Sequence, residues 1–327
     1  MADFPWLRLR RLRRTETLRE MFSETHLRPS DLVQPLFVLP GRGRRESEEG
    51  LPGIIRVTPD MALSEVDGLL RKGIRAVLLF GLPASKSPDG ASACSPGNPL
   101  FEAASEIKRR FPEAAVLADI CLCSHTESGH CGVVSGDEVA NDPTLEILAK
   151  YSVAAAGAGC DAVAPSAMMD GMVRRIREAL DEQGFQDTLI VSYSAKFASS
   201  LYGPFRAAAR SAPLRGDRRG YQLPPGNARE ALRELAADAE EGADVLMVKP
   251  ALPYLDVLSA ARRLTMLPLA AYCVSGEYAM IKSAAGRGWL EEEAAVMEVL
   301  TSIKRAGASL VVTYHAGEAA GWMGRAT

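Results

Sequence analysis

From residue 32 onward, the sequence alternates between apolar runs of strand length and amphipathic segments of helix length. Continuous apolar runs are typical of parallel strands covered on both faces, and strand–helix alternation favours parallel pairing through right-handed crossovers. Eight such runs favour a closed (β/α)8 TIM barrel. An open doubly wound sheet is the alternative, but no G-x-G-x-x-G follows an early strand. Strands are expected at 32–39, 76–80, 115–120, 162–164, 189–193, 245–248, 269–272 and 310–313, and helices at 59–72, 99–111, 143–158, 171–183, 227–242, 253–264 and 291–306.

The length of 327 residues suits one barrel, since such a domain needs about 250 residues and an extension uses the rest. We therefore expect an N-terminal arm over residues 1–31 and a catalytic barrel over residues 32–327. The arm contains the stretch W-L-R-L-R-R-L-R-R at 6–14. A basic tract can bind nucleic acid or an anionic membrane, but the interleaved leucines require an apolar partner. Contact with another subunit is therefore the preferred interpretation.

Charge and hydropathy exclude several classes of partner. The net charge of −3 gives no field that attracts nucleic acid over the whole surface, and no stretch reaches the roughly 18 uncharged apolar residues of a membrane helix. The N-terminus lacks the apolar core of a signal peptide. We expect a cytoplasmic protein that acts on a small molecule and binds neither nucleic acid nor membranes.

Cys121, Cys123 and Cys131 follow the third predicted strand at C-x-C-x7-C spacing. Clustered thiols in a chain of this length indicate metal ligands more than a disulfide framework, and this spacing favours Zn²⁺. Three protein ligands leave a position open for water or substrate, as in a catalytic zinc site. A fourth ligand, either His125 or His130, would make a closed structural site, and thiols without metal are the other alternative.

Two lysines, Lys196 and Lys249, follow apolar strands directly. The active site of a barrel lies at the C-terminal ends of its strands, so both ammonium groups should emerge in the same desolvated mouth. Desolvation and a nearby cation both lower the pKa of an amine, and a neutral lysine attacks a ketone to give a Schiff base. Pairing with a carboxylate or a phosphate is the alternative for either lysine alone.

The longest irregular segment covers residues 202–227 and leaves the end of the fifth predicted strand. A long loop rich in Gly, Pro and Arg is usually a lid or disordered, and its position favours a lid. Guanidinium groups bind carboxylates with two parallel hydrogen bonds, so arginines on a closing lid can hold an acidic substrate. These residues together predict a metal-assisted Schiff-base lyase that acts on small keto acids. The lid arginines are Arg206, Arg210, Arg215, Arg218 and Arg219.

Long motifs extend this interpretation: D-I-C-L-C at 119–123 with G-H-C-G at 129–132, V-A-P-S-A-M-M-D-G at 163–171, Y-S-A-K-F-A-S-S-L-Y-G-P-F-R at 193–206, D-R-R-G-Y-Q-L-P-P-G-N at 217–227, V-L-M-V-K-P-A-L-P-Y-L-D at 245–256 and V-S-G-E-Y-A-M at 274–280. They resemble the porphobilinogen synthase family, also called 5-aminolevulinic acid dehydratase. The resemblance implies a barrel enzyme that condenses two 5-aminolevulinate molecules to porphobilinogen and two waters, in the biosynthesis of tetrapyrroles such as haem.

The resemblance also implies roles for individual residues. Lys249 would form the Schiff base with the propionate-side substrate, and Lys196 would bind the second substrate. The three cysteines match the ligands of the zinc-dependent branch, and Asp119 and Ser166 would assist the reaction. The implied substrate-binding residues are Arg206, Arg218 and Gln222 at the acetate-side carboxylate, Ser275 and Tyr314 at the propionate-side carboxylate, and Tyr202 and Tyr272 along the pocket.

Subunits of the family wrap an N-terminal arm around a neighbour, commonly in an octamer with a hexameric alternative, and the arm here is consistent with a homo-oligomer. Glu234 takes the position of a carboxylate that supports an allosteric Mg²⁺ between subunits in many members, with Arg11 as the candidate arm arginine. An ordinary surface ion pair is the alternative for Glu234. Cys273 replaces a more usual polar residue and is either an extra soft ligand or a packing residue.

Two other functions are compatible with the sequence. Another Schiff-base barrel lyase, such as a class I aldolase, would use the same lysines on a different keto substrate. A non-enzymatic zinc-binding protein would close the thiol site with a fourth protein ligand and direct Lys196 and Lys249 away from any pocket. The relative positions of thiols and lysines therefore separate enzyme from binding protein.

Overall fold

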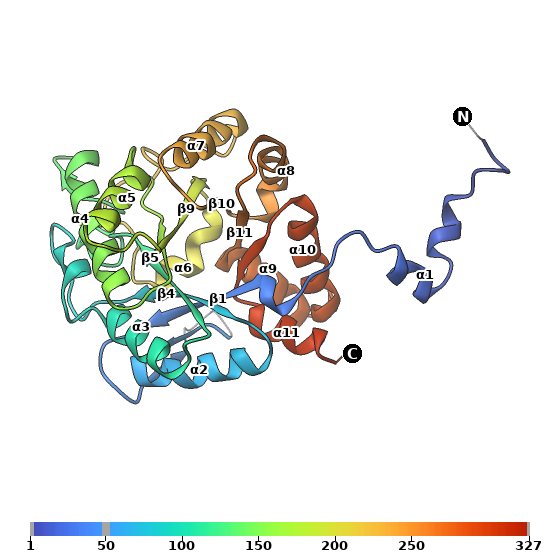
Figure 1. Cartoon of the computed structure of the whole chain (residues 1–327), viewed down its shortest axis with the longest axis horizontal. Helices are drawn as coiled ribbons and strands as arrows, with labels where there is room; N and C mark the ends of the chain where they lie inside the picture. The colour runs from blue at the N-terminus through green and yellow to red at the C-terminus, as the bar shows by residue number, and fades with distance from the viewer. Residues whose placement is uncertain (1–2, 48–52, 326–327) are drawn as a thin grey trace.

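The structure, a computed structural model, describes residues 3–47 and 53–325. Eight parallel strands form a closed barrel, and β12 pairs with β1 to complete the ring. The strands lie where the apolar runs predict them, which confirms the expected (β/α)8 fold (Figure 1). Around the ring they are β1 (Leu32–Val38), β4 (Ala76–Gly81), β5 (Ala115–Ile120), β8 (Ala162–Pro165), β9 (Leu189–Lys196), β10 (Val245–Lys249), β11 (Leu269–Cys273) and β12 (Leu310–Thr313).

Helices cover the outside of the ring and connect successive strands (Figure 1). Every predicted helix is present, and α2 and α3 begin at proline, whose fixed φ suits the first helical turn. Four further helices of the described residues lie outside the predicted set. Two of them, α1 (Glu16–Met21) and α6 (Gly203–Ala208), are only six residues long, while α9 and α11 are rich in Gly and Ala and carry no clear apolar stripe. The helices around the ring are α2 (Pro59–Arg71), α3 (Pro99–Arg110), α4 (Asn141–Gly157), α5 (Met172–Glu182), α7 (Ala228–Glu240), α8 (Leu255–Leu264), α9 (Ser275–Gly286), α10 (Glu292–Ala306) and α11 (Ala316–Met323).

Short elements complete the fold. β3 (Ile55–Val57) pairs with the end of β1 outside the ring, and β2 (Arg45–Ser47) pairs antiparallel with β3. β6 (Val134–Ser135) and β7 (Glu138–Val139) form a separate small ribbon. Within the described ranges, no helix combines the length and the apolar character that crossing a membrane requires.

The barrel strands contribute to two apolar cores. Side chains such as Phe37, Met247 and Tyr272 fill the inside of the barrel. Their neighbours in the chain, such as Leu36 and Val248, point outward and pack against the helices. This alternation follows from the twofold side-chain period of a strand, and it decides which strand-end residues face the barrel mouth.

A β-bulge in β9 interrupts the alternation just before the barrel mouth. Between the paired positions Ser192/Leu246 and Ala195/Val248, β9 contains one more residue than β10. Tyr193 belongs to the inner core, and strict alternation from it would direct the last residue of β9 outward. The extra residue reverses this direction, so that the final lysines of β9 and β10 both point inward. Bulges commonly re-aim side chains in this way beside active sites.

Residues 3–22 of the N-terminal arm stand away from the barrel of their own chain (Figure 1), whereas Leu27 and Asp31 at the end of the arm pack on it. The arm contains η1 (Leu9–Arg13) and α1 (Glu16–Met21), and neither element has a buried residue. Large apolar side chains along the arm are at least half exposed, which is typical of a surface that another molecule covers. These side chains are Phe4, Trp6, Leu7, Leu9, Leu12, Met21 and Phe22.

Candidate active site

The carboxyl ends of four barrel strands bring the predicted catalytic residues together. Lys196 is the last residue of β9, Lys249 is the last residue of β10, and the two are paired in register. Asp119 lies near the end of β5, and Ser166 directly follows β8. All four line one enclosed cavity with space for about one water molecule. The cavity is also lined by Cys123, Tyr202, Phe205 and Arg218.

Lys249 is almost completely buried, with 4% of its surface exposed. Its Nζ lies 4.1 Å from the centre of the Tyr272 ring and 4.8 Å from the centre of the Tyr193 ring. Burial, together with the positive charge of Lys196, lowers the pKa of Lys249 to about 7, although Asp119 acts in the opposite direction. A substantial fraction of this amine is therefore neutral near neutral pH and can act as a nucleophile.

The groups beside Lys249 also have unusual environments. Lys196 donates a hydrogen bond from Nζ to the backbone carbonyl of Ser166. Burial raises the pKa of the Asp119 carboxyl group, while Lys249 and Lys196 oppose that rise. Asp119 Oδ1 and the Tyr193 hydroxyl are buried and have no hydrogen-bond partner among the described residues. Buried polar atoms without a partner are rare in native proteins, so these atoms indicate where a ligand or water binds.

The thiols of Cys121, Cys123 and Cys131 are buried, and their sulfur atoms lie within 4.8 Å of one another. Hydrogen bonds from the other two thiols lower the pKa of Cys131. Three buried cysteines are a donor set for a soft divalent cation and leave one coordination position open, so the residues fit catalytic Zn²⁺. Cys273 is separate from this cluster, because it ends β11 and packs in the outer core.

The two histidines of the thiol loop, residues 121–131, lie outside the thiol cluster. His130 contacts the Tyr221 hydroxyl through Nδ1 and the Arg215 carbonyl through Nε2, both at 3.0 Å. The His125 ring packs edge-to-face against Tyr151, and burial lowers its pKa to about 3. Among the described residues, no histidine therefore lies close enough to the three thiols to act as a fourth metal ligand.

The lid, residues 202–227, starts with α6 (Gly203–Ala208) and returns to the barrel where Leu223 bridges to Phe197. Arg206, Arg218 and Gln222 all carry buried polar atoms that have no partner within the described chain. These atoms are the Nε of each arginine and both amide atoms of the glutamine. Unpaired donors of this kind suit the carboxylate of an acidic substrate.

The other predicted substrate contacts are distributed around the same mouth. Tyr202 lines the cavity itself. The hydroxyl groups of Tyr272 and Tyr314 lie 3.1 Å apart inside the barrel. Ser275 begins α9, and its hydroxyl accepts a hydrogen bond from the backbone N–H of Phe205 at 2.9 Å. Ser275 and Tyr314 therefore contact the lid and the barrel interior, and the cavity lining does not include them.

Glu234 lies outside the barrel, on α7, in a cleft of about 550 Å³. Burial and the nearby carboxylates of Asp238, Asp170 and Glu230 raise the pKa of Glu234. A bound cation would relieve this repulsion. The arm of the same chain points away from the barrel, so Arg11 would reach such a cleft only on another copy (Figure 1).

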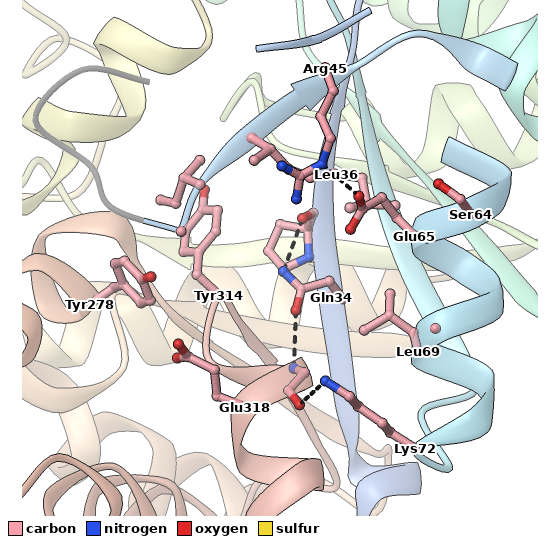
Figure 2. A pocket seen from close by; sticks show the side chains of 16 residues that line it. Gln34, Leu36, Arg45, Ser64, Glu65, Leu69, Lys72, Tyr278, Tyr314 and Glu318 are labelled. Atoms are coloured by element: carbon pink, nitrogen blue, oxygen red, sulfur yellow. Dashed lines mark hydrogen bonds and ion pairs between the residues drawn. The ribbon is translucent and has the colours of Figure 1, made fainter. Parts of the chain in front are cut away.

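A second cavity, of about 370 Å³, lies between β1, α2 and α11, and Tyr314 forms part of its lining (Figure 2). Charged groups on its lining already have partners. Arg45 bonds Glu65 at 3.0 Å, and Lys72 donates to the carbonyl of Gly317 at 3.0 Å. This cavity therefore contrasts with the barrel mouth, where donors and acceptors are left unpaired.

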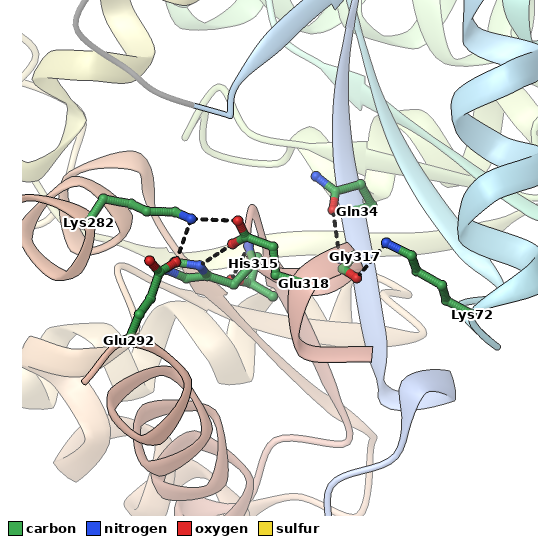
Figure 3. A network of polar contacts seen from close by, with 8 residues as sticks. Gln34, Lys72, Lys282, Glu292, His315, Gly317 and Glu318 are labelled. Atoms are coloured by element: carbon green, nitrogen blue, oxygen red, sulfur yellow. Dashed lines mark hydrogen bonds and ion pairs between the residues drawn. The ribbon is translucent and has the colours of Figure 1, made fainter. Parts of the chain in front are cut away.

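A second cluster of potential metal ligands joins Glu292, His315 and Glu318 outside the barrel (Figure 3). Its cation position is already taken by the ammonium of Lys282, whose Nζ lies 2.5 Å from each carboxylate. His315 Nδ1 contacts Glu318 at 3.0 Å. This cluster is an internal ion-pair network, and the thiols are the stronger candidate metal centre.

Sequence reasoning missed three side chains at the site. Tyr193 and Phe205 place aromatic rings close to the nucleophilic amine. Glu277 is fully buried and accepts hydrogen bonds from the backbone N–H groups of Leu252 and Val274, so it ties together the loops that follow β10 and β11. All three lie inside the long motifs, but only the three-dimensional arrangement assigns them a position relative to the lysines.

The chain is similar to known proteins over almost its whole length. The family model described as Delta-aminolevulinic acid dehydratase matches residues 6–322. A curated delta-aminolevulinic acid dehydratase from Synechococcus elongatus is 51% identical over 98% of this chain and 99% of its own. One from Archaeoglobus fulgidus is 52% identical, again over 98% and 99%. The solved structure of delta-aminolevulinic acid dehydratase (porphobilinogen synthase) from Toxoplasma gondii ME49, in complex with the reaction product porphobilinogen, has a TM-score of 0.96 and 44% identity, covering 98% of this chain and 92% of that one.

Proposed function

Because this chain belongs to the delta-aminolevulinic acid dehydratase family, we propose that it condenses two molecules of 5-aminolevulinate to porphobilinogen and releases two molecules of water. It would thus be a lyase of tetrapyrrole and haem biosynthesis. The observation that carries this proposal is one enclosed cavity lined by Lys196, Lys249 and Cys123 of the thiol cluster. The relative that was solved with porphobilinogen supports the same product.

Lys249 would begin the reaction as the nucleophile. Its pKa of about 7 provides the neutral amine that attacks the ketone carbon of one 5-aminolevulinate. The carbon–oxygen bond then breaks with loss of water, and a Schiff base links Nζ to the substrate. Lys196, paired with it across the sheet, would bind the second substrate. Asp119 lies in the same cavity as both amines and would accept and return protons, with Ser166 beside it.

The three cysteines would hold Zn²⁺. When bound, the ion would supply a Lewis acid that orients and polarises the second substrate. Cys123 lines the same cavity as both lysines, so the thiol cluster adjoins the position where the Schiff base would form.

The lid would recognise the substrate carboxylates. Arg206, Arg218 and Gln222 would hold the acetate-side carboxylate, because their buried donor atoms have no partner in the described part of the chain. Ser275 and Tyr314 would hold the propionate-side carboxylate. Since the cavity has space for only about one water, the lid must open for substrates to enter and for product to leave.

A colour assay and a trapping experiment test the proposal. Purified protein with zinc and a thiol reductant should convert 5-aminolevulinate to a pyrrole that reacts with Ehrlich's reagent. Borohydride added during turnover should attach the substrate to Lys249, as identified by peptide mass spectrometry. Absence of pyrrole would remove the proposal, and trapping only with another keto substrate would favour an aldolase-type lyase instead.

We further propose that Glu234 supports an allosteric Mg²⁺. The raised pKa of this carboxyl group and the three acidic neighbours in its cleft motivate the assignment. Mg²⁺ should stimulate the wild-type protein, and Glu234→Gln should remove that stimulation while leaving basal turnover unchanged. Glu240→Gln, on the same helix but outside the cleft lining, is the matched control. Equal stimulation of the Glu234→Gln variant and wild type would contradict the assignment.

The exposed apolar arm supports a homo-oligomer, and we propose an octamer with a hexameric alternative. Deletion of residues 1–31 should reduce the mass measured by light scattering, because the arm would otherwise cover a neighbouring copy. An unchanged mass would exclude the arm as the assembly element.

We also propose a cytoplasmic location, consistent with six cysteines that are all free thiols.

A further inference from the structure

Three successive carbonyls of the lid are held by side chains from three different parts of the chain. The Ala209 carbonyl accepts a hydrogen bond from Ser124 Oγ at 3.1 Å. The Arg210 carbonyl accepts one from the ammonium of Lys86 at 2.6 Å. The Ser211 carbonyl accepts one from the guanidinium of Arg218 on the returning half of the lid. The end of α6 is therefore fixed from outside the lid as well as from within it.

Lys86 comes from the loop after β4, which is itself joined to the thiol loop. Ser87 donates from its backbone N–H to the carbonyl of His125 at 2.9 Å, and Glu127 donates back to the carbonyl of Ser87 at 3.1 Å. The thiol loop in turn accepts a hydrogen bond from the lid, from Leu214 N–H to the carbonyl of Ser128 at 2.9 Å. Three segments distant in sequence thus form one hydrogen-bonded assembly beside the barrel mouth.

The contact made by Lys86 is unusual in its charge and its backbone geometry. Lys86 is half-buried and, among the described residues, forms no ion pair with a carboxylate; the atom that its ammonium contacts is a backbone oxygen. Arg210 adopts a positive φ of 49°, a conformation that is unfavourable for a non-glycine residue and persists where neighbouring contacts enforce it.

We propose that Lys86 is a positioning residue that latches the closed lid. This inference rests on the proposed function, since it concerns the reaction of that same site. By holding the Arg210 carbonyl, Lys86 fixes the end of α6, which carries Arg206, and the turn that leads back to Arg218. Both guanidinium groups are thereby held over the cavity in which substrate reacts. Lys86 is part of neither the cavity lining nor the thiol cluster, so we expect it to act on lid closure and not on the reacting atoms.

Removal of one charge-assisted hydrogen bond from the closed state should weaken substrate retention about tenfold. Lys86→Met keeps the length of the side chain but removes its charge and its donors. We expect its KM for 5-aminolevulinate to rise about tenfold, with kcat changed less than about threefold. Lys86→Arg retains a cationic donor and should return KM toward the wild-type value. Lys72→Met is the matched control, because Lys72 also donates to a backbone carbonyl, but outside the barrel mouth.

A readout independent of turnover is cleavage by an arginine-specific protease, followed by mass spectrometry. Cleavage after Arg210 attacks the carbonyl that Lys86 holds, so its rate reports release of the latch. Lys86→Met should be cut there about tenfold faster than wild type, while Lys86→Arg and Lys72→Met should resemble wild type. Zinc content and melting temperature should be the same in all four proteins.

Several results would overturn the proposal. Cleavage after Arg210 at the wild-type rate in Lys86→Met would mean that Lys86 does not hold the lid. Equal acceleration in Lys72→Met would mean a general loss of stability, and zinc loss in Lys86→Met would mean that Lys86 acts through the thiol loop. If wild-type protein makes no pyrrole, the proposed function fails, and the protease experiment still reports on the latch.

Discussion

The barrel mouth and the outer surface between α9 and α11 each hold a buried or half-buried lysine next to carboxylates and aromatic rings, yet their pKa values move in opposite directions. Lys249 loses its charge readily, because burial and Lys196 lower its pKa to about 7. Burial also acts on Lys282, but hydrogen bonds from its ammonium to Glu292 and Glu318 outweigh that effect and raise its pKa (Figure 3).

The difference lies in how completely each environment satisfies the charge. Around Lys282 both carboxylates contact the ammonium at 2.5 Å, so the cation is neutralised in place. Around Lys249 a second lysine is in register, and Asp119 Oδ1 has no hydrogen-bond partner in the described residues. A stabilising network pairs its polar groups, whereas a site that must bind a substrate leaves some of them unpaired.

The strongest test of this contrast replaces Lys249 and Lys282, one at a time, with a neutral residue. Lys249→Ala should lower kcat by about 10⁴-fold or more, since it removes the nucleophile, and should leave the far-ultraviolet circular dichroism spectrum unchanged. Lys282→Met, measured in the same pyrrole assay, should keep wild-type turnover. Substantial activity in Lys249→Ala would end the assignment of Lys249 as the nucleophile.

Loss of a thiol should have the next largest effect. Cys123→Ala should lose zinc as measured by metal analysis, and its turnover should fall by about 100-fold or more, because two thiols no longer hold the ion. Cys160→Ala is the matched control, since Cys160 is also buried but lies outside the thiol cluster. Full zinc occupancy in Cys123→Ala would exclude Cys123 as a ligand.

The pH dependence of kcat/KM tests the pKa of Lys249 directly. The amine must be neutral to attack, so the rate should rise with pH through about 7 and should fall about tenfold for each pH unit below that value. The sign follows from the lowered pKa, because protonation at lower pH removes the nucleophile. A rate that stays constant from about pH 5 to 8 would show that another group controls the reaction.

The smallest expected effect concerns the Lys282 network. Lys282→Met should lower the free energy of unfolding by about 1 kcal/mol, because Glu292 and Glu318 then repel each other across a partly exposed site. Chemical denaturation monitored by fluorescence measures this change. Unaltered stability would mean that solvent screens the pair fully, and reduced turnover would mean that the network contributes to the active site.

Sequence alone predicted the barrel and most of its mouth, because strand–helix alternation and side-chain type are local properties. The strand-end positions of Lys196 and Lys249 followed from that alternation, and the thiol cluster followed from the spacing of its cysteines. Periodicity did not reveal α9 or α11, whose small residues give no apolar stripe. Lys86 contacts the backbone of Arg210, and Glu277 contacts the backbone of Leu252. Both partners are distant in sequence, so the order of side-chain types along the chain does not indicate these contacts. The Lys282 network escaped prediction for the same reason, since it joins three separate helical segments.

The bulge in β9 makes the direction of the second amine depend on strand pairing as well as on residue type. Loss of Ser194 would remove the extra residue, and regular alternation from Tyr193 would then still direct Lys196 inward, opposite Lys249. Insertion of one residue between Ala195 and Lys196, with no second bulge to absorb it, would instead turn Lys196 toward the helical shell. Every residue that identifies the motif would still be present in such a protein, yet only one of the two amines would reach the barrel mouth.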